Sequence, residues 1–411
     1  MIHFGNISAD ELAKRYGTPL YIYEGDKIRT NFRRLVKAFR SSGIENIKIH
    51  YAAKANSNPW ILKLLRQEGA SVDVVSPGEI FLAEHAGFNS KDMLFTQNSV
   101  SDEEMKFALE KGIMINVESL SQLVRLGKIA PGSEISIRFN IYVGAGHHSH
   151  VITGGPESKF GIDWEKTDEV KETASRGNLK IKGVHCHIGS GILQAEMFVK
   201  AVKNLFKTAM KFKNLDFVDL GGGIGVPYRP GERAIDIEEL AARLSGEYKE
   251  FCKAYGDSPD LALEPGRFLV AESGSLLCRV TSIKKARKYT FIGTNTGFNH
   301  LIRPAFYGSY HHIEPVEERK GKSIKAVITG NLCESGDVFT RTEEGIEPRE
   351  FSPIEEGDLL AIRNAGAYGF TMASHYNSFL LPPEILIDGD SVKLIRKREK
   401  LEDLLLNVTE M

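Results

Sequence analysis

A regular alternation of strand-like and helix-like segments dominates roughly the first two thirds of this 411-residue chain. Short runs rich in β-branched and aromatic residues are typical of buried strands, and amphipathic segments lie between them. Eight such runs separated by helices over about 240 residues match the size of a (β/α)₈ barrel, with a doubly wound open sheet as the alternative. The strand-like runs are 47–53, 71–75, 92–96, 113–117, 134–140, 180–187, 216–220 and 260–264.

Helical spacing of apolar residues accounts for most of the intervening segments. Ser101 followed by Glu104 is a capping box, which marks the start of one of these helices. Helices are therefore predicted at 27–40, 58–69, 78–87, 101–112, 118–128, 192–212 and 236–255.

Chemically versatile residues stand where several of the predicted strands end. They are Lys54, Asp73, His187, the glycines at 221–223 and Glu264. A barrel enzyme builds its active site at the carboxyl ends of its strands. This distribution therefore favours the barrel over the open sheet.

The pattern changes after Arg267, where helical periodicity becomes rare. We expect a barrel domain at 27–267 and an all-β domain formed by 268–411 together with 1–26. The extended segment 20–23 would join the sheet of that second domain. The other β-type runs of the second domain are 268–271, 275–282, 289–293, 325–329, 358–363, 384–388 and 392–396.

Composition excludes several classes of partner. A net charge of −1 provides no basic field for nucleic acid or anionic lipid, and no apolar run reaches membrane-spanning length. The four cysteines (Cys186, Cys252, Cys278 and Cys333) are scattered, without metal-like or disulfide-like spacing. We therefore expect a cytoplasmic protein with free thiols, no bound metal, and no nucleic-acid or membrane partner.

Lys54 closes the apolar run 47–53. A lysine at the end of a buried strand is costly unless its amine is paired, solvated or chemically employed. A partly desolvated lysine can form an imine with a carbonyl compound. The alternative is a surface lysine whose amine reaches solvent.

Two further motifs stand where predicted strands end: 185–190 ends the sixth strand, and 221–225 follows the seventh. The glycines of 221–225 would let backbone amides approach an anion such as phosphate, although a turn that needs positive φ explains them equally well. In 185–190, strand alternation puts His185 and His187 on one face, where a neutral imidazole could stack on a planar ligand. A zinc site with the nearby His147, His148 and His150 is the less favoured alternative.

Glu264-Pro265-Gly266-Arg267 ends the eighth predicted strand. A carboxylate there could keep a heteroaromatic nitrogen protonated, and the arginine could bind an anionic substrate. A structural Glu–Arg ion pair that closes the barrel is the alternative.

Taken in order, the motifs 51–56 (YAAKAN), 185–190 (HCHIGS), 221–225 (GGGIG) and 264–267 (EPGR) resemble those of the fold-type III pyridoxal-phosphate decarboxylases. That group includes diaminopimelate, ornithine and arginine decarboxylases, and it is related to alanine racemase. The resemblance extends from Tyr21 through Asn377.

The resemblance implies a set of roles around pyridoxal 5'-phosphate. Lys54 would carry the cofactor as an imine, and His187 would pack on its ring. Glu264 would pair with the pyridinium nitrogen, and Asp73 would lie near the lysine. The other cofactor-binding residues implied are Ser190, Gly222, Gly223, Gly225, Gly266, Arg267 and Tyr368.

The second domain resembles diaminopimelate decarboxylases in three segments, 303–307, 333–337 and 365–368. The resemblance implies that Cys333 returns a proton and that the active site is shared within a homodimer. It also implies catalytic roles for Lys54, His187 and Glu264. The substrate-binding residues implied are Arg267, Arg303, Tyr307, Glu334 and Tyr368.

Decarboxylation of meso-2,6-diaminopimelate to L-lysine is therefore the leading hypothesis. Three segments depart from the pattern of these relatives: 295–300 reads NTGFNH, 379–381 reads FLL, and Ile141 follows Asn140 in place of a proline. They leave open a decarboxylase for another basic or dicarboxylic amino acid, free or carrier-bound. An amino-acid racemase and a non-catalytic carrier of the cofactor are further alternatives.

Overall fold

A computed structural model describes residues 1–146, 155 and 157–409. The chain divides into two compact units. The first comprises Met1–Ile28, Pro227–Glu232 and Val270–Met411, and the second comprises Arg29–Val226 and Arg233–Leu269. The domain boundaries expected from the sequence, 27–267 and 268–411 with 1–26, stay a prediction.

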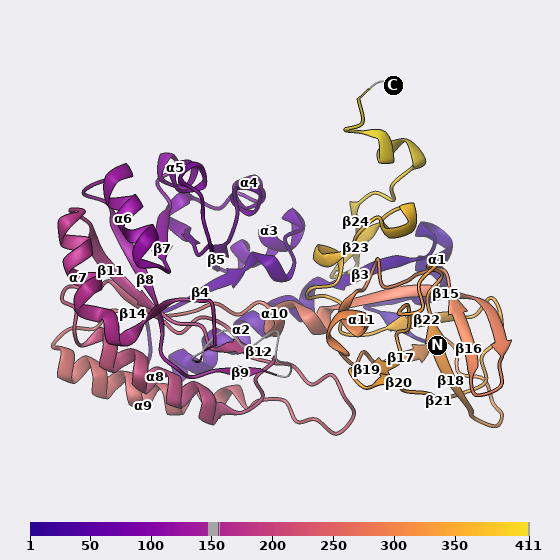
Figure 1. The fold of residues 1–411 in the computed structure, drawn as a ribbon. Coiled ribbons are helices and arrows are strands. Elements are labelled where there is room, and N and C mark those ends of the chain that lie inside the picture. Colours follow the sequence, from indigo (N-terminus) through magenta and orange to yellow (C-terminus); the bar gives the residue numbers. More distant parts are fainter. Residues whose placement is uncertain (147–154, 156, 410–411) are drawn as a thin grey trace. The chain divides into compact units, whose positions relative to one another are not determined.

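The second unit is built on a closed barrel of eight parallel strands (Figure 1). The last strand in sequence pairs with the first, Leu261 opposite Ile47, so that no edge remains. This confirms the predicted fold class and excludes the open sheet. The strands are β4 (Ile47–Ala52), β5 (Ser71–Val74), β6 (Met93–Phe95), β7 (Met114–Val117), β8 (Glu134–Asn140), β11 (Lys180–His185), β13 (Phe217–Asp219) and β14 (Asp260–Leu263).

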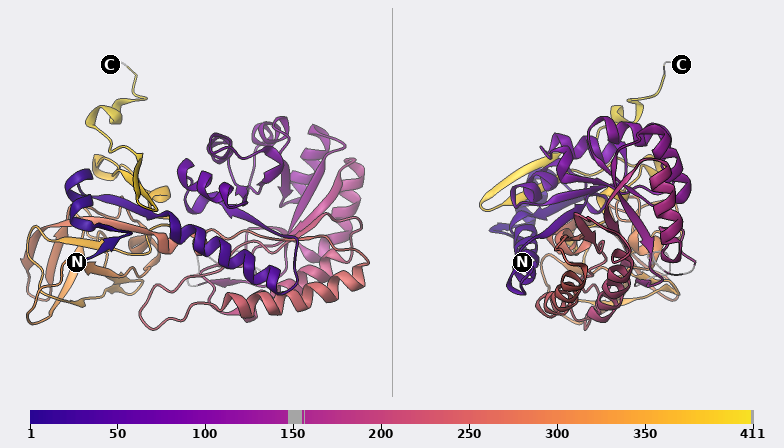
Figure 2. Two further views of the ribbon diagram at one scale, coloured as in Figure 1. Left: turned by 180° about the vertical axis from the view of Figure 1, so that it is seen from behind. Right: turned by 90° about the vertical axis from the view of Figure 1, so that its left-hand side faces the viewer.

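Helices surround these strands, as the end view in Figure 2 shows. The capping box of Ser101 and Glu104 opens α5 as predicted. A helix that the sequence analysis did not identify, α7, lies between β8 and β11. The helices are α2 (Gly25–Ser41), α3 (Pro59–Gln67), α4 (Pro77–His85), α5 (Asp102–Glu110), α6 (Leu120–Ile129), α7 (Thr167–Arg176), α8 (Ala195–Ala209) and α9 (Ile237–Tyr255).

The barrel interior contains both apolar and polar side chains. Leu94 of β6, Phe217 of β13 and Ala262 of β14 form an apolar cluster. Gly183 makes room for it, because a Cβ there would lie 2.3 Å from Cζ of Phe217. Other strand positions carry polar residues instead, all of them buried except the partly buried His50. They are His50, Asp73, Asn116, Arg138, His185 and Asp219.

Short elements complete this unit near the strand ends. β9 (Ala145–Gly146) pairs in parallel with β12 (Gly189–Ser190), and β10 (Ile162–Asp163) adds to β8. Residues 268–271, which the sequence analysis assigned to a strand, instead form helix α10 (Arg267–Val270) and the start of η5 (Ala271–Ser273). A four-residue apolar run has no periodicity that separates a strand from a buried helical turn.

The first unit is organised around the long strand β15 (Gly274–Lys285). One end of β15 pairs with β3 (Leu20–Glu24) and β22 (Leu359–Ile362), and the other end pairs with β16 (Thr290–Thr294). The segment expected to join this sheet therefore does so as β3. The remaining strands are β1 (His3–Phe4), β2 (Ile7–Ser8), β17 (Ile313–Pro315), β18 (Ile324–Thr329), β19 (Arg341–Thr342), β20 (Gly345–Ile346), β21 (Arg349–Phe351), β23 (Glu384–Asp388) and β24 (Ser391–Arg396).

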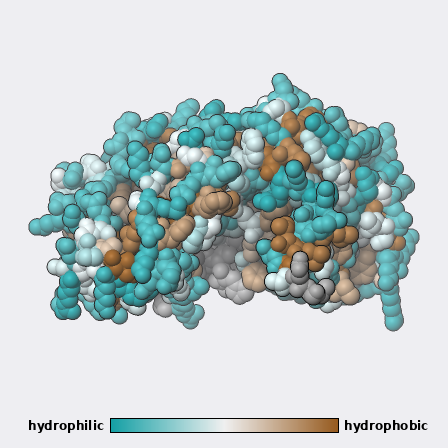
Figure 3. Space-filling view, turned by 90° about the horizontal axis from the view of Figure 1, so that it is seen from above, coloured by the Kyte–Doolittle hydropathy of each residue, from teal (hydrophilic) through white to brown (hydrophobic). Residues whose placement is uncertain are grey.

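Two short α-helices, α1 (Ala9–Tyr16) and α11 (Arg303–Tyr307), also belong to the first unit. Leu12 of α1 packs against Ile22 and Leu277 in the core of the sheet. Hydrophilic residues dominate the molecular face shown in Figure 3, with small hydrophobic patches between them. Among the described residues, no helix has both the length and the apolar character that crossing a membrane requires.

Candidate active site

Lys54 lies just beyond the end of β4, in the 3₁₀ turn η1 (Ala53–Ala55). Its Nζ is 3.1 Å from Oδ2 of Asp73, which is fully buried on the neighbouring strand β5. The strand register places Asp73 opposite Ala52 and thus beside the turn that carries the lysine. The lysine side chain is 39% exposed, so its amine is paired with a buried carboxylate while remaining accessible.

Glu264 follows β14 and is buried, with Oε2 3.0 Å from Nε2 of His185. Burial, reinforced by the nearby Asp73 and Asp219, raises the pKa of the Glu264 carboxyl well above its usual value. Burial also lowers the pKa of His185 to about 4. The imidazole of His185 is therefore neutral at neutral pH, and burial disfavours the charged form of the Glu264 carboxyl beside it. The other carboxyl oxygen, Oε1, has no hydrogen-bond partner among the described residues.

His187 lies on the loop after β11, and its Nδ1 accepts a hydrogen bond from the Gly222 amide at 2.9 Å. Burial, followed by the charge of Lys54, holds the pKa of His187 well below its usual value, so the ring is neutral. A Cβ at Gly222 would lie 2.1 Å from the Glu264 carbonyl oxygen. Glycine at 222 is therefore required by the close approach of the loops that follow β13 and β14.

The remaining glycines of the loop pack against the loop that contains Ser190. A Cβ at Gly223 would lie 2.8 Å from the Gly189 carbonyl oxygen, and a Cβ at Gly225 would lie 2.7 Å from the carbonyl carbon of Gly191. Gly221 and Gly223 also have positive φ, +67° and +109°. The next helix, α9, begins only at Ile237, so this loop is not itself a helix N-terminus.

Arg267 joins the same region, because its Nη2 donates to Oγ of Ser190 at 3.0 Å. Arg267 is buried, and the preceding Gly266 lies against η1, where a Cβ would come within 2.9 Å of the Ala55 Cβ. Lys54, Asp73, His187, Ser190, the glycine loop, Glu264 and Arg267 thus share the carboxyl-end region of one barrel.

A polar layer beneath this region was not predicted as part of the site. Asp219 accepts from the Gly221 amide at 2.8 Å through Oδ1, and its Oδ2 is 3.3 Å from Nδ1 of His50. Arg138 is buried on β8, and burial lowers its pKa. These residues could have been identified from the sequence, because each is a titratable residue at an inward-facing position of an otherwise apolar strand.

Glu79 was also missed. It lies in the first turn of α4, and its carboxylate accepts from the Val75 amide at 2.8 Å. Burial raises the pKa of Glu79 to about 7.

The zinc alternative gains no ligand set from the described residues. His185 is bonded to Glu264, and His187 accepts from a backbone amide. His147, His148 and His150 lie outside the described residues. The group with ligand-like spacing in the described part of the chain is instead His50, Asp219 and Glu264, whose ligand atoms lie within 4.8 Å of one another.

In the first unit, Arg303 opens helix α11 and is buried, with an exposed fraction of 1%. Tyr307 ends the same helix, half-buried, with its ring edge-on to Phe306. Tyr368 is also half-buried and has a positive φ of 55°.

Cys333 and Glu334 are exposed in the described chain. The Cys333 amide donates to Oδ1 of Asn377 at 2.8 Å, and the Tyr376 hydroxyl lies 3.4 Å from Oε2 of Glu334. All four cysteines are free thiols. Burial raises the pKa of Cys186 and Cys278, whereas Cys333 is open to solvent.

Two of the departures noted in the sequence contact each other. Nε2 of His300 donates to the Leu380 carbonyl at 3.1 Å, and its Nδ1 accepts from the Thr296 hydroxyl at 2.9 Å. Burial lowers the pKa of His300 to about 4, which fits this neutral tautomer. Asn295 bonds the Arg279 amide and Oγ1 of Thr18. These departures therefore have structural roles within the first unit.

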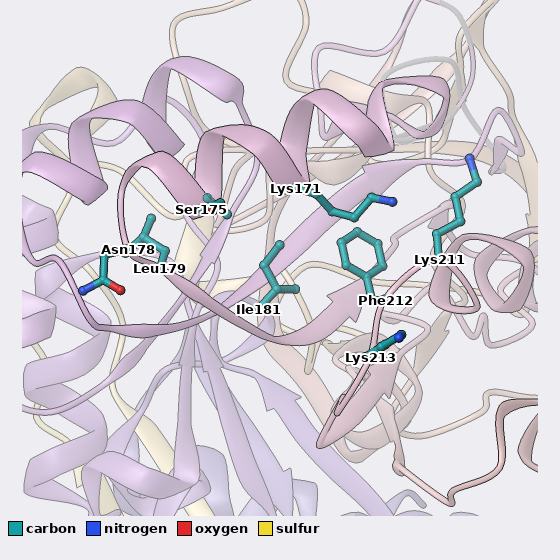
Figure 4. Close-up of a pocket in the computed structure, with 9 residues that line it drawn as sticks. Lys171, Ser175, Asn178, Leu179, Ile181, Lys211, Phe212 and Lys213 are labelled. Atoms are coloured by element: carbon teal, nitrogen blue, oxygen red, sulfur yellow. The ribbon is translucent and has the colours of Figure 1, made fainter.

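A surface pocket of about 570 Å³ lies elsewhere on the barrel unit (Figure 4). The pocket is formed by the end of α7, the start of β11 and the segment after α8. It therefore adjoins the amino end of β11. Its lining is Lys171, Ala174, Ser175, Asn178, Leu179, Ile181, Lys211, Phe212 and Lys213. None of these residues belongs to the candidate active site.

Comparison with known proteins places this arrangement in a family. Residues 25–271 match the model described as "Pyridoxal-dependent decarboxylase, pyridoxal binding domain". A diaminopimelate decarboxylase of Methanothermobacter thermautotrophicus is 46% identical over 98% of this chain and 94% of its own length. That of Escherichia coli K12 is 36% identical over 96% of this chain and 94% of its own.

Solved structures agree with the sequence relatives. A diaminopimelate decarboxylase of M. jannaschii in complex with L-lysine superposes with a TM-score of 0.90 at 34% identity, covering 98% of this chain and 95% of that one. A family model that matches most of the chain and relatives that align along nearly its whole length lead to one conclusion: the chain belongs to the pyridoxal-phosphate-dependent decarboxylases.

Proposed function

We propose that the protein decarboxylates meso-2,6-diaminopimelate to L-lysine and carbon dioxide. The observation that carries this proposal is the full-length similarity, up to 46% identity, to diaminopimelate decarboxylases from both archaea and bacteria. The lysine/ornithine decarboxylase of Vibrio vulnificus shares the fold at 23% identity. No observation favours the racemase or the non-catalytic carrier.

The residues at the carboxyl end of the barrel fit pyridoxal phosphate. Oε1 of Glu264 is buried without a hydrogen-bond partner in the described chain, and a buried carboxyl whose pKa is raised is stabilised as a carboxylate by an adjacent cation. A protonated ring nitrogen would be that cation. The loops that hold Ser190, Arg267 and Gly222–Gly225 would surround the phosphate.

Each barrel residue then has a defined task. Lys54 holds the cofactor covalently, and Asp73 orients the Lys54 amine. His187, kept neutral by burial, would pack on the ring without adding a positive charge. When bound, the cofactor would supply an electron sink for decarboxylation. Glu264 would maintain the protonation of the ring nitrogen.

The first unit supplies the groups proposed for the far end of the substrate. Arg303 would provide a guanidinium group for the far carboxylate, and Tyr307 and Tyr368 are further substrate-binding residues proposed in this unit. Arg267 of the barrel unit would provide a second guanidinium group. Glu334 would bind the distal ammonium. Cys333 would return a proton to the carbon that has lost its carboxylate.

We also propose that the working unit is a cytoplasmic homodimer with shared active sites. Cys333 and Glu334 are exposed in the described chain although their proposed tasks require contact with a bound substrate. A site completed by the partner subunit would give them that contact.

Glu264→Gln should retain the cofactor but reduce turnover by about a hundredfold, because a neutral amide stabilises a pyridinium poorly. Cofactor absorbance and carbon dioxide release measure the two effects separately. Glu238→Gln, at an exposed ion pair with Arg34, is the matched control. Wild-type turnover in Glu264→Gln would show that this carboxyl does not serve the ring nitrogen.

Arg303→Met should lower kcat/KM for meso-diaminopimelate about ten- to a hundredfold, because a charge-assisted bond to the far carboxylate is lost. The cofactor spectrum should persist, since no barrel residue changes. Arg319→Met, at an exposed ion pair with Asp358, is the control. Equal weakening of inhibition by L-lysine, the product that keeps the far carboxylate, and by 1,5-diaminopentane, which lacks it, would contradict the proposed role of Arg303.

Mixing inactive Lys54→Ala and Cys333→Ala subunits should restore part of the activity if the sites are shared, because one hybrid site then receives both native residues. The measurement is carbon dioxide release before and after subunit exchange, with each variant alone as the control. Complete exchange without recovered activity would argue for sites confined to single subunits.

A further inference from the structure

Three residues, His311, Ser309 and Tyr228, surround the guanidinium of Arg303, and the hydrogen bonds to His311 and Ser309 fix its plane. Nη1 is 3.0 Å from Nε2 of His311, and Nη2 donates to Oγ of Ser309 at 3.2 Å. The guanidinium carbon lies 4.6 Å from the ring centroid of Tyr228, which covers one face of the group. All three partners belong to the same compact unit as Arg303.

The hydrogen bonds of His311 determine its tautomer. A guanidinium can only donate, so Nε2 of His311 must accept the bond from Nη1. Nδ1 of His311 therefore carries the proton, and it lies 2.8 Å from the Arg363 carbonyl oxygen, which can only accept. Both contacts are satisfied by one neutral form of the ring.

The surroundings of His311 hold that ring in place. His311 is fully buried, and its ring stands edge-on to Tyr228 with centroids 5.4 Å apart. The His311 carbonyl accepts from Nη1 of Arg349 at 2.7 Å. The Pro227 carbonyl accepts from Asn364, which ties the segment of Tyr228 to the same unit. The acceptor presented to Arg303 therefore has a fixed position.

We propose that His311, together with Ser309, is a positioning residue that sets the orientation of Arg303 and thereby the selectivity for substrates with a distal carboxylate. The inference rests on the proposed role of Arg303 in binding that carboxylate. Recognition of a carboxylate by both ends of a guanidinium depends on the direction of its plane. Without the hydrogen bonds to His311 and Ser309, the guanidinium of Arg303 keeps its charge but is no longer held in one orientation.

Two substitutions at His311 separate positioning from packing. The amide of Asn mimics Nδ1, so His311→Asn keeps a donor toward the Arg363 carbonyl and removes the acceptor for Arg303. The longer Gln places an oxygen near the position of Nε2, so His311→Gln restores that acceptor. His312→Phe is the matched control, because His312 is the adjacent histidine, half exposed, and lies near Glu314.

The experiment compares two ligands of the holoenzyme that differ by one carboxylate: L-lysine and 1,5-diaminopentane. His311→Asn should weaken inhibition by L-lysine and raise the KM for meso-diaminopimelate about tenfold, while inhibition by 1,5-diaminopentane changes less than about twofold. His311→Gln should recover most of the loss. His312→Phe and the cofactor spectrum of every variant should match the wild type.

Ser309→Ala offers a second test that tolerates a folding failure at His311. It removes the hydrogen bond to Nη2 of Arg303. Inhibition by L-lysine should weaken about threefold, while inhibition by 1,5-diaminopentane should not change. Equal weakening of both ligands, unchanged binding of L-lysine, or a Gln variant as impaired as the Asn variant would overturn the inference. Arg303→Met distinguishes a failure of the inference about His311 from a failure of the proposed role of Arg303. If Arg303→Met weakens inhibition by L-lysine selectively but the His311 and Ser309 variants do not, His311 and Ser309 do not position Arg303. If Arg303→Met itself shows no selective weakening, Arg303 does not bind the distal carboxylate.

Discussion

Burial of polar and titratable groups inside the barrel is the constraint on which the active site depends. Such groups are costly in an apolar interior unless they are paired or hydrogen-bonded. The barrel pairs Lys54 with Asp73, and Asp219 with His50 and the Gly221 amide. Among the buried side-chain atoms that have no hydrogen-bond partner within the described residues, three belong to residues at or beside the candidate site: Oδ1 of Asp73, Nδ1 of His185 and Oε1 of Glu264. A bound cofactor would relieve this cost, so the chemistry and the fold share the same residues.

The barrel was predictable because its strands are short apolar runs at regular spacing, and the parity of each strand indicates which residues face inward. The pairing of His185 with Glu264 was not, because the two residues are 79 positions apart and meet only when the barrel closes. Helix α7 was missed because it buries only Thr167, Val170 and Ala174, too few for a clear period. Residues 268–271 were assigned to a strand because four apolar residues carry no period at all.

The first unit shows why substrate recognition is harder to derive from sequence than cofactor chemistry. Arg303 was proposed as a substrate-binding residue from its motif, but His311, whose Nε2 lies 3.0 Å from its guanidinium, was not singled out. The departures at Asn295 and around Leu380 suggested a changed substrate. Their contacts instead support the interior of this unit, since His300 bonds the Leu380 carbonyl. An unusual residue in a motif can therefore reflect local packing.

The central claim is that the carboxyl end of this barrel holds pyridoxal phosphate through Lys54. Borohydride reduction of the holoenzyme, followed by proteolysis and mass spectrometry of the peptides, tests it directly. The account predicts a pyridoxyl group on the peptide that contains Lys54, and none when Lys54→Ala is treated in the same way. A pyridoxyl group on a different lysine would contradict the account.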